Sequence, residues 1–317
     1  MKQFIVSIFV STLALWAQDS SVSRSTSVDV NGRRVSNGPD VVQTKSSRGA
    51  EVTERVQSVN GRTVPIERVE ERVLRDDASG RVVERVIRSY SPTGDPLPPI
   101  KETVDEQKRP DGGSTIQTTT YRGDINGGMQ LLRKSTTDVR IQGSVQSVDT
   151  LVQQPTVNGS LETVEKQNTV KMKESGDNYR EDSTTYRRDA NGNLVVAVQQ
   201  ATLHTQQGSE ATDQTAESEI GPDGRLQLHT QTVAKTVTRS DGSKETELNV
   251  FGANVAGTVD PSSKLRLQEQ QIIEKRPGPG NSVVETLSVR RPSVADPNAL
   301  GPAHQISETV CRGKCDK

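Results

Sequence analysis

Thr184-Thr185-Tyr186-Arg187-Arg188-Asp189-Ala190-Asn191-Gly192-Asn193-Leu194 decides the fold, because it runs from a strand-forming segment into an Asn-Gly turn and out again. An Asn-Gly pair tolerates positive φ at both turn residues and is a strong hairpin signal. Much of the stretch also stands 65 positions earlier, as Thr119-Thr120-Tyr121-Arg122 and Asp124-Ile125-Asn126-Gly127. A strand-turn-strand unit that returns at a fixed spacing predicts a repeat architecture.

Glycines extend this repeat along most of the chain. Sorted into four columns, they recur at steps of about 65 residues. The columns are Gly49, Gly112, Gly176 and Gly242; Gly61, Gly127, Gly192 and Gly257; Gly80, Gly143 and Gly208; and Gly94, Gly159 and Gly224. We infer four units of this length, each with four segments of about ten to twelve residues joined by turns.

The segments between the turns read as β-strands, since they are rich in Val, Thr, Gln, Glu and Arg. In residues 225–234, alternation puts Leu226, Leu228 and Thr230 on one face. Short turns join antiparallel neighbours. The sequence therefore predicts an all-β, repetitive antiparallel β-meander of four units with four strands each. It leaves open whether the strands form one elongated sheet, stacked sandwiches or a coiling shell.

The hairpin tips are the positions best placed for recognition, because exposed loops on a rigid scaffold commonly carry binding residues. The tips come from three of the Asn-Gly and Asp-Gly turns. The candidate tip residues are Asp124, Asn126, Gly127, Asp189, Asn191, Gly192, Asp223 and Gly224.

The N-terminus has the layout of a cleaved secretory signal peptide. Lys2 precedes an apolar run over residues 4–17, which ends at Ala17 before polar residues begin. The run is shorter than the roughly 20 residues that a spanning helix needs. We expect a secreted or extracytoplasmic protein whose mature chain has no transmembrane segment.

The repeat and the ends divide the chain into seven parts. We expect a signal peptide at 1–17, an N-terminal linker at 18–43, repeats at 44–106, 107–171 and 172–236, a degenerate fourth repeat with Pro and Gly insertions at 237–300, and a C-terminal tail with a cysteine pair at 301–317.

The composition limits both the core and the partners. Only 30% of the residues are hydrophobic and 3% aromatic, with a mean hydropathy of -0.67, so any core must be thin. The 40 basic and 41 acidic residues are interspersed and leave a formal net charge of -1. This balance argues against a nucleic-acid partner. We expect the partner to be a protein or glycan at the cell surface.

The titratable residues give no catalytic, cofactor-binding or metal site. His204, His229 and His304 each stand alone in strand or loop sequence. Asp189, Asn191 and Asn193 share the first spacings of a calcium loop, but Leu194 and Gln200 occupy its required Gly and Glu positions. We expect no catalytic residue, no cofactor and no bound metal.

The two cysteines, Cys311 and Cys315, lie in Cys-Arg-Gly-Lys-Cys at the C-terminus. An oxidising compartment favours a disulfide between them. Two ligands without a nearby His or further Cys are too few for a tetrahedral zinc site. The pair is therefore a disulfide candidate that would close a small loop in the tail.

The stretch from Tyr186 to Leu194 resembles the tyrosine-aspartate repeats of the bacterial RHS family. Residues 121–129 are a degenerate second copy and residues 251–259 a poorer third. The resemblance covers about a tenth of the chain, and the wide spacing of the turns and units departs from the shorter family repeat. It implies a shell of β-hairpins, of the kind that encloses toxins or acts at cell surfaces, and no particular activity.

These features predict a secreted or cell-surface structural and binding protein that is not an enzyme. Adhesion and envelope assembly are the roles that suit such a repeat. One alternative is an RHS-like encapsulating or delivery shell. The other is a periplasmic hydrolase whose site escapes linear motifs.

Overall fold

The computed structural model describes most of the chain as strands and turns, with no helix among the residues it describes. Nineteen strands form one sheet, and every strand pairing is antiparallel. The expected all-β class and antiparallel meander are confirmed. The described residues are 21–28, 34–36, 41–47, 50–59, 62–124, 126–221, 224–252, 265–280, 282–293 and 299–312.

The strands follow the predicted pattern of short segments between turns. The first nine are β1 (Ser21–Val28), β2 (Arg34–Ser36), β3 (Val41–Ser47), β4 (Ala50–Val59), β5 (Arg62–Asp77), β6 (Gly80–Ser89), β7 (Ile100–Lys108), β8 (Ser114–Gly123) and β9 (Met129–Gln142). The other ten are β10 (Val145–Pro155), β11 (Leu161–Lys173), β12 (Tyr179–Arg188), β13 (Leu194–Gln207), β14 (Glu210–Ile220), β15 (Leu226–Thr238), β16 (Lys244–Gly252), β17 (Arg266–Gly278), β18 (Ser282–Arg290) and β19 (His304–Arg312).

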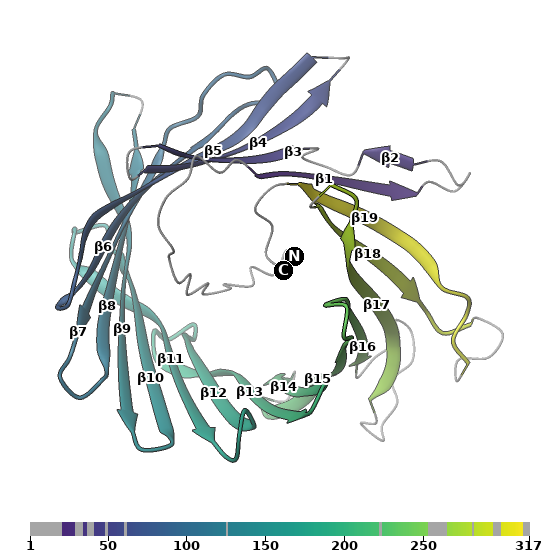
Figure 1. Cartoon of the computed structure of the whole chain (residues 1–317). Helices are drawn as coiled ribbons and strands as arrows, with labels where there is room; N and C mark the ends of the chain where they lie inside the picture. The colour runs from purple at the N-terminus through teal and green to yellow at the C-terminus, as the bar shows by residue number, and fades with distance from the viewer. Residues whose placement is uncertain are drawn as a thin grey trace.

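The sheet closes on itself as a single-layered ring (Figure 1). Each strand from β3 to β18 pairs with the next, and β1 joins the two ends by pairing with both β3 and β19. The short β2 occupies a second part of the same edge of β1. The described strands therefore form neither the elongated sheet nor the stacked sandwiches that the sequence left open.

Two segments at the ends of the chain differ from their expected roles. The expected linker at 18–43 contains β1, β2 and the start of β3, and the expected tail at 301–317 contains β19. The pairing of β1 with β19, as in the pair Ser23↔Cys311, joins opposite ends of the chain, so no local pattern in the sequence indicates it. The expected signal peptide at 1–17 lies outside the described residues.

The ring is too wide for its own side chains to fill. Since β2 and β3 share one position, the perimeter is about 18 strands at about 4.8 Å, or about 86 Å. The diameter is therefore about 27 Å before strand tilt enlarges it. Side chains from opposite walls of such a ring do not meet, so packing occurs mainly between neighbouring strands.

Side-chain burial is accordingly low, as the composition predicts. Among the described residues, Val83 and Val289 are the buried hydrophobic side chains, and none is completely buried. Ladders of polar pairs connect the strands instead, such as the hydroxyls of Thr137 and Thr150 at 2.9 Å. Each such pair contributes about 0.2–1 kcal/mol, so the sheet is stabilised by many small terms.

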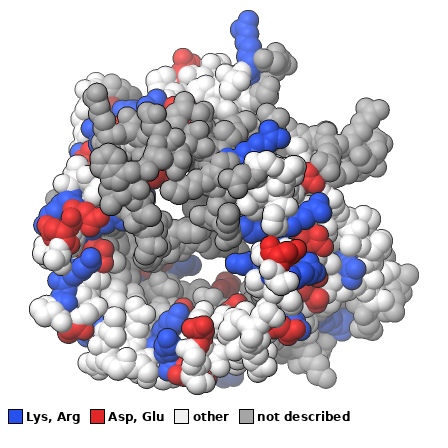
Figure 2. Space-filling model, in the orientation of Figure 1, with Lys and Arg blue, Asp and Glu red and all other residues white. Residues whose placement is uncertain are grey.

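Ion pairs add to these ladders around the ring. Arg85 on β6 binds Glu71 on β5 at 2.7 Å and Glu102 on β7 at 3.1 Å. Burial acts to lower the pKa of Arg85, but the two carboxylates outweigh it and raise that pKa. Figure 2 shows basic and acidic side chains side by side on the visible face, with no large area of one sign.

Irregularities in the ladders recur at the spacing of the sequence repeat. Four register shifts between consecutive strands follow it: Arg55/Val56, Thr120/Tyr121, Thr185/Tyr186 and Val250/Phe251. Turn hydrogen bonds follow it too, since the amides of Arg109, Glu174 and Arg239 each donate to the carbonyl four residues on, at 2.8 to 2.9 Å. Register shifts and turn hydrogen bonds of the same kind thus occur at several places around the ring.

Candidate binding site at one end of the ring

The turns of a meander alternate between the two ends of the ring. The even-numbered strands from β4 onward all finish at one end of the ring, which we call the even end. We call the opposite end the odd end. The turns after β8, β12 and β14 all lie at the even end. Every candidate tip residue that the structure describes belongs to these three turns, and Asp223 lies outside the described residues.

Aspartates shape two of these even-end turns in the same way. Asp124 Oδ1 accepts hydrogen bonds from the amides of Asn126 and Gly128, both at 2.8 Å. Asp189 Oδ1 accepts from the amides of Asn191 and Asn193, at 2.9 and 2.8 Å. These bonds fix the turn, as in an Asx motif.

One oxygen of each carboxylate is therefore used by backbone donors of its own turn. Gly127 and Gly192 follow with φ of 82° and 83°, the left-handed conformation that glycine tolerates. Within the described residues, no group of three or more His, Cys, Asp or Glu side chains is placed to hold a metal ion.

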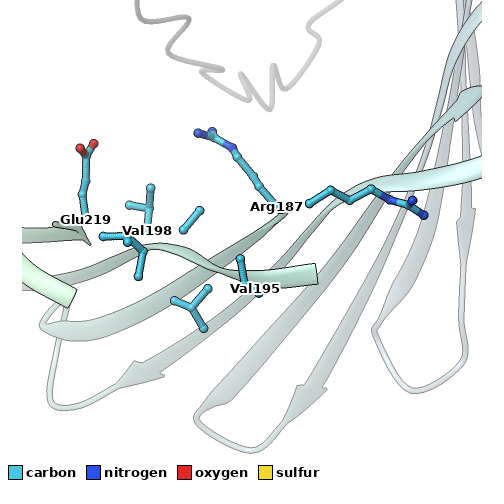
Figure 3. Close-up of a pocket in the computed structure, with 8 residues that line it drawn as sticks. Arg187, Val195, Val198 and Glu219 are labelled. Atoms are coloured by element: carbon cyan, nitrogen blue, oxygen red, sulfur yellow. The ribbon is translucent and has the colours of Figure 1, made fainter. Parts of the chain in front are cut away.

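A shallow pocket of about 310 Å³ lies beside the turn that joins β12 to β13 (Figure 3). Its lining combines apolar and charged residues. The lining residues are Arg187, Arg188, Val195, Val196, Ala197, Val198, Glu219 and Ile220.

The pocket forms where the ladder between β13 and β14 stops short of the even end. That ladder ends at the pair Val198↔Glu219, whereas the ladder between β12 and β13 continues to Arg188↔Leu194. Residues 194–196 of β13 therefore have a ladder partner on the β12 side, and Ala197 lies at the register shift. None of residues 194–197 has a ladder partner among the described residues on the β14 side. The pocket occupies the resulting gap.

The charged residues of the pocket differ in their pairing. Arg187 and Glu219 point to the same side of the sheet, towards the inside of the ring (Figure 3). Arg187 Nε lies 2.9 Å from a carboxylate oxygen of Glu165, and Arg188 pairs with Glu162. The Glu219 carboxylate has no hydrogen bond or ion pair with any described residue, so it is the unbalanced charge of the pocket.

A second cluster lies on the same face, further from the even end. His204 Nδ1 lies 2.6 Å from Asp213 Oδ1, and the His204 ring stacks on Tyr179 with centroids 4.8 Å apart. Lys171 approaches the Tyr179 ring from β11, with Nζ 3.5 Å from its centroid. Burial raises the pKa of Tyr179, and Asp213 and Glu181 raise it further. The phenol therefore stays protonated at neutral pH.

The cluster corrects the interpretation of His204 as an isolated residue. The cluster was missed because cross-strand residue pairs can be read from a sequence only when the turn between the two strands and any β-bulge in them are known. His204 and Asp213 are equally far from the turn at 207–210, so this pair could have been found from the turn alone. Tyr179 could not, because its pairing with His204 depends on the register shift at Thr185/Tyr186.

Cys311 lies in β19, where it pairs with Val283, and Cys315 lies outside the described residues. Bridged cysteines have Cα atoms about 4.4–6.8 Å apart, which a fully extended Cys-x3-Cys segment exceeds. β19 ends at Arg312, and the residues that follow lie outside the described part of the chain. We expect non-reducing mass analysis of secreted protein to find the C-terminal peptide two hydrogens lighter than its dithiol form. Recovery of two free thiols would contradict the expected disulfide.

Comparisons with known proteins identify no family. No family model matches the sequence, and no curated protein matches it. A solved structure, a porin-like protein from Bacteroides uniformis, is 8% identical, and the match covers 74% of this chain and 97% of that one. Its TM-score of 0.18 is too low to bear on fold or function. The resemblance to RHS repeats stays a prediction.

No helix in the described part of the chain has both the length and the apolar character needed to cross a membrane.

Proposed function

We propose that the protein is a non-catalytic, extracytoplasmic scaffold that binds a protein or glycan at a cell surface through the turns at its even end. The observation that carries this proposal is the gathering of the described candidate tip residues at that end. The turns after β8 and β12 have the same geometry, so the ring displays matching turns at two places along one end. Repeated surfaces favour attachment to a repetitive partner by adding weak contacts.

Four units of equal length are part of this proposal. They are supported by the register shifts and turn hydrogen bonds that recur at the spacing of the sequence repeat. Export is also part of it, supported by the apolar N-terminal run and its polar flank. Adhesion and envelope assembly both suit a rigid ring with repeated turns.

Charge added at the even end should weaken attachment. The side chains of Asn126 and Asn191 are exposed and are not used in the turn hydrogen bonds. We expect the double substitution Asn126→Lys and Asn191→Lys to reduce binding of labelled protein to cells of the source organism by about tenfold, the effect of losing a dominant contact. Flow cytometry of cells that lack the protein measures this.

The matched control adds the same charges at the odd end. Ser175 and Ser240 are exposed residues of the turns after β11 and β15. The double substitution Ser175→Lys and Ser240→Lys should leave binding within about twofold, since it changes only non-contacting surface. An equal loss from both pairs of substitutions would indicate a charge effect without an even-end site.

A second candidate is an encapsulating shell, which the closed ring favours. A ring about 27 Å or more across leaves an interior that a cargo segment could occupy. Such a shell predicts a hollow particle that co-purifies with a polypeptide protected from protease. Small-angle scattering and limited proteolysis of the secreted material distinguish it from a free scaffold.

A further inference from the structure

We propose that the gap between β13 and β14 at the even end is a docking site for an extended, apolar polypeptide segment that carries a basic residue. The segment would add a strand to the unpaired edge of β13, the mode of recognition known as β-augmentation. This inference deepens the proposed function and rests on it, because it names the chemistry of a partner at the same end of the ring.

The backbone of β13 supplies the first argument. Residues 194–196 pair with β12, and Ala197 lies at the register shift between the two strands. None of residues 194–197 has a ladder partner among the described residues on the β14 side. Such an edge presents amide and carbonyl groups to any extended chain that enters the gap. Its four residues suffice for a short stretch of antiparallel pairing.

The pocket supplies the second argument. Its volume of about 310 Å³ falls at the lower end of the range for small-ligand pockets, about 300–1,000 Å³, so it has room for a short part of a chain. Val195 and Val198 belong to its apolar lining, and Val195 is 43% exposed. Apolar side chains of the incoming segment would cover this surface.

Glu219 selects the charge of the partner. It lies opposite Val198 in the last pair of the ladder. Arg187 and Arg188 are already paired with Glu165 and Glu162, so the unpaired carboxylate leaves the pocket one negative charge in excess. A lysine or arginine in the docked segment would balance it.

The equivalent place in the preceding unit lacks these features, which makes the site specific. In that unit, Gln130, Arg133 and Gln154 stand where β13 and β14 have Val195, Val198 and Glu219. The ladder there also ends early, at the pair Lys134↔Gln153. The gap is thus repeated, but its apolar and acidic lining is not.

The test titrates purified full-length protein with a fluorescein-labelled peptide of sequence Thr-Val-Lys-Val-Thr-Val, followed by fluorescence anisotropy. We expect saturable binding with one peptide per ring. N-methylation of alternate peptide amides should weaken binding by about tenfold or more, because those amides then cannot donate to β13. Equal binding of the methylated peptide would overturn strand addition.

Two variants test the side chains. Val195→Gln with Val198→Arg installs the residues that β9 already carries at these positions, so the fold has a precedent for them, and circular dichroism verifies it. We expect this variant to bind at least about tenfold more weakly. Glu219→Gln should weaken binding of the lysine peptide by about tenfold and leave binding of a Thr-Val-Gln-Val-Thr-Val peptide unchanged.

Controls separate this inference from the proposed function. Glu217→Gln, two residues away on the same strand, should leave both peptides unaffected. Unchanged affinity in the Val195/Val198 variant, or absence of any peptide binding, would overturn the docking site. The even-end scaffold would still stand if the Asn126 and Asn191 substitutions reduce cell attachment by about tenfold, since that experiment does not use the gap.

Discussion

Gly80→Ala is expected to destabilise the ring by about 3 kcal/mol, the combined effect of backbone strain and overpacking. Gly80 begins β6 with a φ of 156°, a conformation that favours glycine. A Cβ at this position would lie 1.9 Å from the carbonyl oxygen of Glu106 on β7. That contact is with backbone, so relief requires β6 and β7 to separate.

The matched controls are the glycines that the sequence places in the same column. Gly143 and Gly208 have φ of 60° and 61°, and a Cβ on either would meet nothing within 4 Å. Each Gly→Ala change should cost only about 1 kcal/mol, the penalty of a left-handed alanine. Chemical denaturation of the three variants measures the difference. Equal losses would show that the close approach of Glu106 is absent.

Removal of residues 109–173 is expected to give a smaller ring that still folds cooperatively. The cut joins Lys108 directly to Glu174, whose turn has the same backbone bond as the turn at Arg109. Lys108 pairs with Ser114, and the corresponding Lys173 pairs with Tyr179. After the deletion β7 can therefore pair with β12 in the register that β11 now uses.

Four of about 18 strand positions are lost, so the radius should fall by about one fifth. Small-angle scattering and thermal unfolding measure this. The control removes residues 109–157, which takes out three strands. An odd number reverses the direction of β19 relative to β1, and the antiparallel closure cannot form. We expect that variant to aggregate. Similar behaviour of the two deletions would contradict a unit of four strands.

The antiparallel hairpins were predictable because they depend on local turn chemistry. The glycines alone align the expected units only approximately. Gly80 was aligned with Gly143, yet the equivalent hydrogen bonds from Lys108 and Lys173 go to the carbonyls of Ser79 and Ser144, so the glycine precedes the acceptor in one turn and follows it in the other. The position of the glycine can differ by a residue or two between equivalent turns, whereas the pairing register of the strands is fixed by which side chains face each side of the sheet.

The candidate site was less predictable than the fold. The sequence indicated the turns around Asp124 and Asp189, since their residue types favour such conformations. It did not indicate the pocket, which depends on where the ladder between β13 and β14 ends. Nor did it indicate closure, because no local pattern in β1 specifies β19 as its partner.

Closure also determines how the molecule must fold. Thr26 of β1 donates to the carbonyl of Glu308 in β19, 282 positions away. Hairpins of neighbouring strands can form while the chain is being synthesised, but β1 cannot pair with β19 until the C-terminal strand has been made. Contacts of such long sequence separation form slowly. Until then both outer strands remain open to pairing with another chain, so the newly made protein passes through an aggregation-prone stage that ends only when its first and last strands meet.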